Sequence, residues 1–517
     1  MTEQLKLKLN DSKATRWGAL VIVAFTMMAA YYVNDVVAPL KTMLESDLAW
    51  TSSDFGFFTG GYSFLNVFFL MLIWGGLILD RFGIRFTGKL STILMVGGTA
   101  LEYYAMTGLA GPDAQIFGLN EIFGYKAGVF VAFAGYSIFG VGAEVAGITV
   151  SKIIAKWFRG KELATAMGVQ VALARIGSQA GYAVAIPLAR AFGITTPVLV
   201  GLILLLGGLV AFFIFSVMDK KLDKQMEAAA IAAGTEGEEE KFSFKDVKNI
   251  LVNPGFWLIA LLCVLFYSCV FPFQKFASEL MIIKYGINEN VAGTFAGLPA
   301  LGALILTPIF GGFIDKRGKS ASIMILGAAM LIGVHFIYAI PAINYWLVAI
   351  GLMIILGIAF SLVPSAMWPA VAKIFPVSQL GTAYALIFFI QNIGLWGIPT
   401  LIGKVLDVYC IVGKKADGTN LYDYTIPMCI FTGIACLSLV VAFMLKRADK
   451  KYGILPFKSN VSVLPSALAL TPTRVKLETS VNSLSLTPNK PATSLSVISL
   501  ASVSYTHLRA HETLANL

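Results

Sequence analysis

The sequence lacks the motifs by which many metalloenzymes, hydrolases and nucleotide-driven pumps are identified. Five cysteines occur among 517 residues, mostly within apolar stretches and without metal-ligand spacing, which favours small core residues over a metal site. The chain has no HExxH, no P-loop lysine motif and no GxSxG. We therefore expect no enzyme, no cofactor, no metal and no ATP-driven pump.

Charge is also scarce. Charged residues make up 13% and hydrophobic residues 57% of the chain, against roughly 25% and about 45–50% in soluble domains. Apolar runs recur along the chain, each long enough to cross a bilayer as a helix, at about 17–40, 54–79, 86–108, 126–151, 162–189, 196–218, 254–277, 291–314, 320–340, 344–367, 380–403 and 425–446. The runs are continuous, unlike the alternating strands of a membrane barrel. The sequence therefore predicts an all-α membrane protein with twelve transmembrane helices.

A charged turn occurs once in each half of the chain. The signature from Gly76 to Arg85 joins two apolar runs, and a degenerate copy from Gly311 to Lys319 joins two more. Glycine allows a sharp turn and close helix approach. The turn resembles the loop between the second and third helices of the major facilitator superfamily. That resemblance implies two pseudo-symmetric six-helix bundles, with gating residues Asp80, Arg81, Gly83, Arg85, Asp315 and Lys316.

The repeat divides the chain into segments. We predict an N-terminal segment, a first bundle, a linker, a second bundle and a disordered tail at 1–16, 17–218, 219–253, 254–446 and 447–517. Within the linker, the helical spacing of Phe244, Val247, Ile250 and Leu251 predicts a short amphipathic helix on the membrane surface, with a disordered linker as the alternative. The stretch from Val503 to Thr513 resembles translated sequencing-adapter sequence, so the last residues carry no functional prediction.

The net charge of +10 is distributed asymmetrically. Lysine and arginine gather in the segments that share one side of the membrane with the N-terminus, and they are sparse on the opposite side. This asymmetry is the positive-inside rule and predicts that both termini are cytoplasmic. It also accounts for the basic charge without nucleic acid. The first apolar run is too long for a signal-peptide core, so we expect a retained helix.

Two ionisable residues lie deep within predicted helices, where charge is costly. Glu144 is about 12 Å and Arg175 about 20 Å above the cytoplasmic helix ends, at 1.5 Å per residue. Their offset of about 8 Å is long for a tight ion pair in straight helices. Two interpretations stay open. The charges neutralise each other, or they bind opposite ends of a zwitterion, with the arginine fork on a carboxylate.

Other polar and aromatic residues in the runs have several explanations. For Asn34 and Asp35, near the outer end of the first helix, interfacial placement or gate packing is favoured over substrate contact. The same holds for Lys275 and Glu279, which stand four apart and could pair along one helix face. The remaining candidates could wall a cavity or pack against neighbours and lipid: Tyr62, Trp368, Tyr384, Gln391 and Asn392.

Several stretches narrow the resemblance. Among them are Tyr62–Asn66, Gly168–Gln170, Gln379–Tyr384 and Ile390–Leu395. Over residues 17–450 the chain resembles the lysosomal dipeptide uniporter branch of the superfamily and its microbial relatives. The resemblance implies alternating access around a central cavity and movement of dipeptides. It also implies that Glu144 meets the peptide amino terminus and Arg175 the peptide carboxylate.

The leading hypothesis is a secondary transporter of small zwitterionic solutes, dipeptides by resemblance. Its partners would be the small-molecule substrate and the lipid bilayer. A bacterial plasma membrane is the expected location, or a lysosomal membrane if the source is eukaryotic. One alternative keeps the fold but carries organic anions or drug-like solutes with proton coupling through Glu144. Another is a non-transporting membrane sensor.

Overall fold

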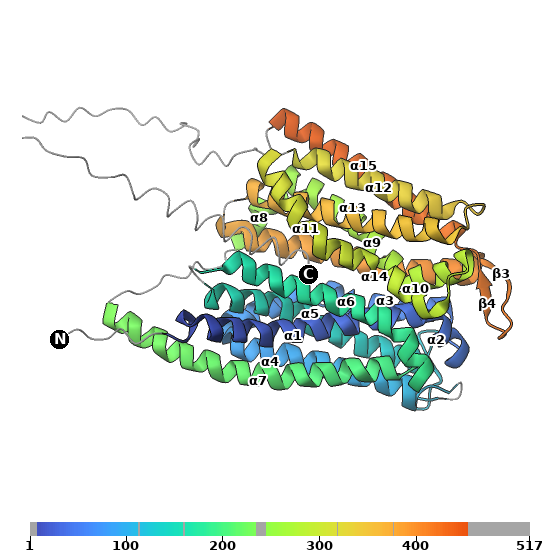
Figure 1. The fold of residues 1–517 in the computed structure, drawn as a ribbon, viewed down its shortest axis with the longest axis horizontal. Coiled ribbons are helices and arrows are strands. Elements are labelled where there is room, and N and C mark those ends of the chain that lie inside the picture. Colours follow the sequence, from blue (N-terminus) through green and yellow to red (C-terminus); the bar gives the residue numbers. More distant parts are fainter. Residues whose placement is uncertain are drawn as a thin grey trace, which may run out of the picture.

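The helices form two stacked groups that run along a common direction (Figure 1). The computed structural model describes residues 8–111, 114–158, 161–233, 244–317, 319–375 and 377–452. We call the two ends of the molecule the α2 end, where α2 and the β3–β4 hairpin lie, and the linker end, where α8 lies (Figure 1).

The N-terminal half contains six long helices. They are α1 (Lys13–Val36), α3 (Ser52–Phe68), α4 (Met71–Gly108), α5 (Ala127–Trp157), α6 (Leu163–Phe192) and α7 (Thr196–Ala233). The shorter elements are η1 (Leu9–Asp11), η2 (Ala38–Leu40), α2 (Lys41–Asp47) and the hairpin of β1 (Glu121–Ile122) and β2 (Tyr125–Lys126). Helix α4 packs on α5, and α1 packs on α6 and α7.

The C-terminal half has a corresponding set. Its helices are α9 (Pro254–Tyr285), α10 (Glu289–Ala296), α11 (Leu298–Arg317), α12 (Ser320–Ala339), α13 (Trp346–Ile374), α14 (Val377–Tyr409) and α15 (Thr425–Tyr452), with the hairpin of β3 (Ile411–Lys414) and β4 (Asn420–Tyr422) before α15. Helix α9 packs on α14 and α15, while α12 packs on α13 and α15. The halves meet where α14 packs on α3, and where α10 and α11 pack on α6.

The prediction of a helical membrane protein is confirmed, and each predicted apolar run falls on one helix or on two consecutive helices. Within the described residues, nine helices are long and apolar enough to span a membrane, or ten if the bent pair α3 and α4 is one span. That pair carries two predicted runs, because α4 continues through the signature turn. The remaining predicted run is α6, which contains the polar residues Gln170, Arg175 and Gln179.

Two backbone breaks shape α3 and α4. Their axes differ by 59° across the junction, where Leu70 has a left-handed φ of 54°. Further along, Gly83 interrupts α4 with φ 74° and ψ 173°, a conformation that glycine adopts without a steric penalty. The signature turn is therefore a glycine-centred kink between two helical stretches.

The linker region is more helical than predicted. Helix α7 continues to Ala233, past the expected end at 218. The first residue of the extension, Asp219, is a buried carboxylate that accepts bonds from Lys156 Nζ at 2.7 Å and Trp157 Nε1 at 3.0 Å. The predicted short helix is present as α8 (Phe244–Val252). Residues 1–7, 234–243 and 453–517, which include most of the predicted tail, lie outside the described residues.

Glycines allow the two halves to approach closely. A Cβ built on Gly56 of α3 would lie 2.4 Å from the Pro399 carbonyl oxygen of α14, and one on Gly293 of α10 would lie 2.2 Å from the Tyr182 carbonyl oxygen of α6. Such distances leave no room for a side chain without backbone movement. The two interfaces flank the space between the halves.

Candidate functional site

A cavity lies between the two halves. It holds ≈ 1070 Å³ of space not filled by protein atoms, part of it open to solvent. Residues of α1, α3, α4, α5 and α6 line it from the N-terminal half, and residues of α9 and α14 line it from the C-terminal half. The lining mixes aromatic rings with a few charged and amide groups, as small-molecule sites usually do.

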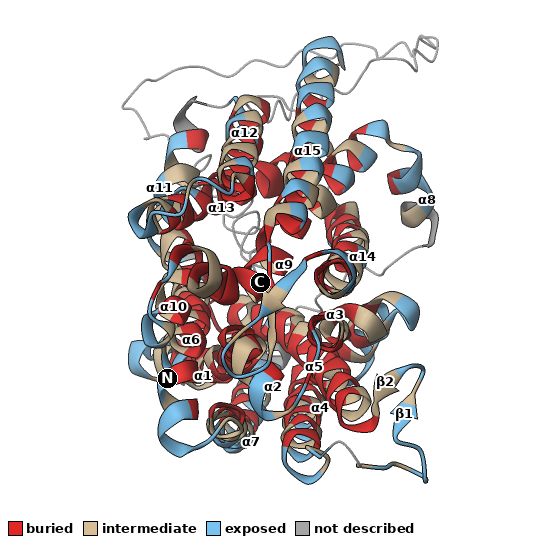
Figure 2. Cartoon of the chain, turned by 90° about the vertical axis from the view of Figure 1, so that its right-hand side faces the viewer, coloured by how far each residue is buried: buried red, intermediate tan, exposed pale blue. Residues whose placement is uncertain are grey.

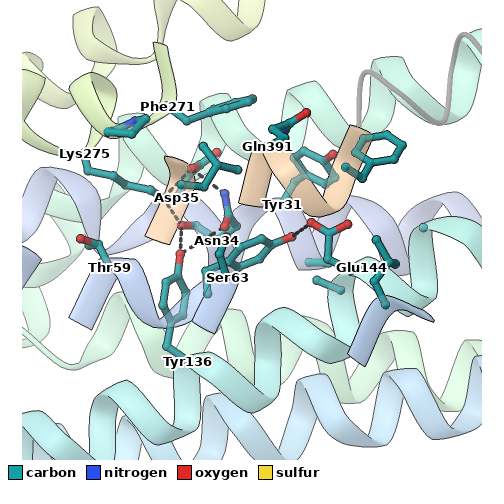
Figure 3. Close-up of a pocket in the computed structure, with 18 of the residues that line it drawn as sticks. Tyr31, Asn34, Asp35, Thr59, Ser63, Tyr136, Glu144, Phe271, Lys275 and Gln391 are labelled. Atoms are coloured by element: carbon teal, nitrogen blue, oxygen red, sulfur yellow. Dashed lines mark hydrogen bonds and ion pairs between the residues drawn. The ribbon is translucent and has the colours of Figure 1, made fainter. Parts of the chain in front are cut away.

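One polar group in the cavity is built around Glu144. The Tyr62 hydroxyl donates a hydrogen bond to Glu144 Oε1 at 3.0 Å, and Figure 3 shows the Glu144 carboxylate in the lining. Arg175 also lines the cavity. Its guanidinium carbon lies 5.6 Å from the Tyr31 ring centroid and 5.1 Å from the Phe360 ring centroid, within cation–π range. An acid and a guanidinium therefore share one cavity.

A second polar group crosses between the halves. Lys275 Nζ of α9 lies 3.0 Å from Asp35 Oδ1 and donates to the Asn34 carbonyl oxygen at 2.6 Å. The Ser178 hydroxyl donates to Asp35 Oδ2 at 2.5 Å, and the Tyr136 hydroxyl donates to the Asn34 carbonyl at 2.8 Å. In Figure 3 this group lies away from Glu144 along the cavity. The cavity thus contains two separate groups of charged side chains.

The predicted binding residues divide into two sets. Tyr62, Glu144, Arg175 and Gln391 line the cavity, and the Cys263 thiol donates to Gln391 Oε1 at 3.3 Å.

The other three predicted residues are not among the lining residues. Trp368 is fully buried and donates from Nε1 to the Tyr267 hydroxyl at 3.2 Å. The Tyr384 hydroxyl donates to the Trp368 carbonyl at 3.1 Å, and Asn392 Nδ2 donates to the Phe388 carbonyl at 3.0 Å. These three therefore pack within the C-terminal half beside the cavity.

Helical spacing was a usable signal for lining residues that the sequence analysis missed. Tyr136 precedes Glu144 by two turns on α5, and Thr59 precedes Tyr62 by about one turn on α3. Extending each face from its strongest candidate would have included both. The sequence favours interfacial placement or gate packing over substrate contact for Asp35 and Lys275, yet both line the cavity. Their pairing cannot be deduced from spacing.

The signature residues lie toward the linker end. Lys152 Nζ of α5 donates to Asp80 Oδ1 at 2.9 Å, and Arg85 Nη1 lies 3.3 Å from Asp219 Oδ2 and 2.5 Å from Asp223 Oδ2. These bonds stay within the N-terminal half.

The remaining predicted gating residues have fewer described contacts. The Arg81 guanidinium carbon lies 5.6 Å from the Phe82 ring centroid, and Gly83 forms the kink in α4. Asp315 and Lys316 stand at the end of α11, and their side chains lie outside the described residues.

A buried charge cluster joins the halves at the α2 end. Lys41 Nζ of α2 lies 2.5 Å from Glu279 Oε2 of α9 and also bonds Glu45. Lys415 Nζ lies 3.8 Å from Glu45 Oε2 and 3.7 Å from Glu279 Oε1. The Tyr424 hydroxyl also donates to Glu279. Two acids and two bases thus neutralise one another out of water. Lys275 and Glu279, which could have paired along α9, instead pair with Asp35 and Lys41 of the N-terminal half.

Helix-end contacts close the same end. The backbone amides of Ser52 and Ser53, at the start of α3, donate to Asp407 Oδ1 at 3.1 Å and Oδ2 at 2.5 Å. A carboxylate at a helix N-terminus is favourable because it binds free amides and the positive end of the helix dipole. The Tyr422 hydroxyl donates to Asp407 at 2.9 Å, and burial raises the pKa of this phenol, which therefore stays neutral. On the other flank, Arg190 bonds Glu289 of α10.

Comparison with known proteins establishes the family. The model of the Major Facilitator Superfamily matches residues 20–398. The chain belongs to this superfamily. It is a multi-pass membrane transporter whose surroundings are lipid and whose cargo is a small molecule.

Among curated proteins, the chain is similar to the "Lysosomal dipeptide transporter MFSD1" of Homo sapiens, at 28% identity over 84% of this chain and 87% of the relative. The protein of the same name from Gallus gallus is 31% identical over 60% of this chain and 67% of the relative. The inner membrane transport protein YdiN of Escherichia coli is 31% identical over 23% of this chain and 27% of its own length.

Solved structures share the fold. A crystal structure of a point mutant of the nucleoside transporter NupG superposes with a TM-score of 0.62 at 12% identity, covering 83% of this chain and 98% of that one. An inward-facing, unoccupied bacterial homolog of the human lysosomal transporter Spinster gives 0.63 at 14% identity, covering 85% and 98%. At these identities the likeness supports the superfamily fold alone.

Replacing Lys41 tests the buried cluster. Lys41→Met would leave Glu45 and Glu279 buried beside each other with less neutralising charge. Breaking a buried ion pair from one side costs about 3–5 kcal/mol, so we expect a clear loss of thermal stability of the purified protein in detergent. Lys414→Met, on an exposed lysine of the same hairpin as Lys415, is the matched control. Equal melting temperatures for the two variants would contradict the role given to Lys41.

Proposed function

We propose that this protein is a secondary transporter that moves dipeptides by alternating access. The observation that carries the proposal is one cavity, between two halves, lined by both the Glu144 carboxylate and the Arg175 guanidinium. A dipeptide carries an ammonium group at one end and a carboxylate at the other. Glu144 would bind the ammonium group, and Arg175 would bind the carboxylate through its planar fork. The similarity to lysosomal dipeptide transporters favours the same cargo.

The offset expected between the two charges bears on the size of the cargo. The offset expected along the helices is about 8 Å, and two extended residues span at most about 7 Å. A single amino acid, at about 3.5 Å, would reach only one charge unless the site contracted. The side chains of Glu144 and Arg175 are long and can close the small difference between the charge offset and the length of a dipeptide. The spacing therefore favours dipeptides over free amino acids.

Neighbouring groups would position the peptide. The Tyr62 hydroxyl holds one oxygen of Glu144, which leaves the other oxygen for an ammonium group. The Tyr31 ring packs on Arg175 and would keep the guanidinium plane oriented. Gln391 supplies an amide from the C-terminal half, so a bound peptide would touch both halves. Contact with both halves is what links binding to movement in this kind of carrier.

Alternating access would rock the predicted bundles, 17–218 and 254–446, around the cavity. In the described state, the Lys41 cluster and the Asp407 bonds join the halves at the α2 end. We propose that the signature residues Asp80, Arg81, Gly83, Arg85, Asp315 and Lys316 join the halves at the linker end when the α2 end opens. The energy for net movement would come from a solute gradient.

Chemically blocked peptides test the two charge assignments together. We expect Glu144→Gln to weaken binding of a free dipeptide about 10- to 150-fold, the effect of losing a charged hydrogen bond of about 1.5–3 kcal/mol. The same change should barely affect an N-acetylated dipeptide, which carries no ammonium group. Arg175→Lys should weaken binding of the free dipeptide and leave binding of the C-terminally amidated dipeptide nearly unchanged. Binding is measured by ligand-induced stabilisation of the purified protein.

Two outcomes would reject the assignments. If blocked and free peptides bind the unmodified protein equally, neither charge recognises a peptide end. If organic anions bind tightly and dipeptides do not, the proton-coupled organic-anion carrier replaces the dipeptide hypothesis. Gln391→Leu is a useful comparison, because it alters the cavity without changing either charge. It should reduce binding of free and blocked peptides by the same factor.

Orientation follows from the basic residues of the linker end. We propose that this end, with both chain termini, faces the cytoplasm. The membrane would be a bacterial plasma membrane, or a lysosomal membrane if the source is eukaryotic. A reporter that fluoresces only in the cytoplasm, fused after Tyr452, is expected to be bright, while the same reporter inserted in the β3–β4 loop should be dark. The reverse pattern would invert the proposed orientation.

A further inference from the structure

A short motif occurs twice in the connection between α4 and α5. Ile116-Phe117-Gly118-Leu119 is followed by Ile122-Phe123-Gly124-Tyr125. Each copy forms a tight turn with left-handed φ angles at both central residues, 52° and 78° in the first turn and 53° and 78° in the second. The flanking residues pair with each other across each turn. These are two successive turns of the type that normally joins hairpin strands.

Phenylalanine is an unusual choice at the first central position. Asparagine, aspartate and glycine dominate there because other side chains are strained at positive φ. Packing does not explain the exception, because Phe117 is 99% exposed and Phe123 is 88% exposed. The chain therefore bears backbone strain twice to hold two large apolar rings at the surface. The described residues leave most of both rings uncovered.

The hairpin lies where the edge of a bilayer would be. Viewed from the α2 end, β1 and β2 stand beyond the outer margin of α4 and α5, away from the centre of the bundle (Figure 2). Helix α5 has 31 residues, or about 46 Å at 1.5 Å per residue. A bilayer is about 30 Å thick in its hydrocarbon core and about 40–45 Å thick with headgroups. The residues just before α5 therefore fall at the headgroup level.

The neighbouring surface is apolar and faces outward. The Phe123 ring centroid lies 6.0 Å from that of Phe130 in the first turn of α5. Tyr104, about one turn before the end of α4, is 54% exposed. The two rings of the hairpin thus stand near other aromatic rings at the adjoining ends of α4 and α5. Such aromatic belts are characteristic of membrane interfaces.

Charge indicates which lipid surface fits. Residues 114–126 contain only Glu121 and Lys126 as charged side chains, and the Lys126 ammonium group donates to the Ala49 carbonyl. The hairpin therefore has no free basic cluster for anionic headgroups. A zwitterionic bilayer, entered by apolar insertion, is the complementary surface.

We propose that the α4–α5 hairpin, residues 114–126, inserts Phe117 and Phe123 into the headgroup–acyl boundary of the bilayer at the α2 end. The hairpin ties the ends of α4 and α5 to the membrane surface. This anchoring is independent of the identity of the transported solute.

Fluorine labels test the position of each ring. Trifluoromethyl-phenylalanine is incorporated singly at Phe117 or Phe123 of the full chain, in phosphatidylcholine nanodiscs. Phe213, half exposed on α7, is the lipid-facing control, and the fully buried Phe55 is the shielded control. The ¹⁹F line is then recorded with nitroxide-labelled lipids and, separately, with a water-soluble gadolinium chelate.

Insertion predicts that the labelled lipid broadens the lines at 117 and 123 as strongly as the line at 213, while the chelate broadens them little. Broadening by the chelate alone would place both rings in water, available to a protein partner, and would overturn the proposal. Lines that respond to neither reagent, as expected for Phe55, would overturn it by placing the rings in a protein interior.

Discussion

Charge removed from water must be neutralised, and this constraint organises the contacts between the two halves of the molecule. Lys41 and Glu45 of α2, Glu279 of α9 and Lys415 of the β3–β4 loop form a neutral group at the α2 end. Removing one member would leave an uncompensated buried charge, which is the expensive case. The cluster therefore disfavours arrangements of the halves that separate its members.

The same constraint would permit the two states that the proposed alternating access requires. Backbone contact through Gly56 and Gly293 allows close approach of the halves, but packing alone would favour one state. Ion pairs such as Asp35 with Lys275 can separate when water enters, because each partner is then solvated. A closed end with neutral pairs and an open end with hydrated charges can thus lie close in free energy. Cargo that contacts both halves would shift this balance.

The sequence predicted most of the fold because helices in a bilayer need long continuous apolar runs. The predictions from the sequence failed where charged side chains pair with residues that are distant in the sequence. Asp219 and Asp223 were assigned to a solvated linker, yet Arg85 and Lys156 hold both against the N-terminal half and α7 continues past them. Similarly, the spacing of Lys275 and Glu279 allows a local pair, whereas their partners are Asp35 and Lys41.

For the candidate site, sequence reasoning identified charged residues better than aromatic ones. Glu144 and Arg175 stand out in apolar helices because charge there is costly, and both line the cavity; their roles in binding stay predictions. Trp368 and Tyr384 are as compatible with packing as with a cavity wall, since a large ring suits both. Which face of a helix meets the cavity depends on tertiary packing, and that information is absent from the local sequence.

Counterflow in liposomes tests the central claim most directly. Purified protein is reconstituted, the vesicles are loaded with unlabelled dipeptide, and entry of a trace of labelled dipeptide is followed without any imposed ion gradient. The account predicts rapid entry that Arg175→Ala abolishes at equal protein content. Entry no faster than in protein-free vesicles, across dipeptides of acidic, neutral and basic side chains, would contradict it.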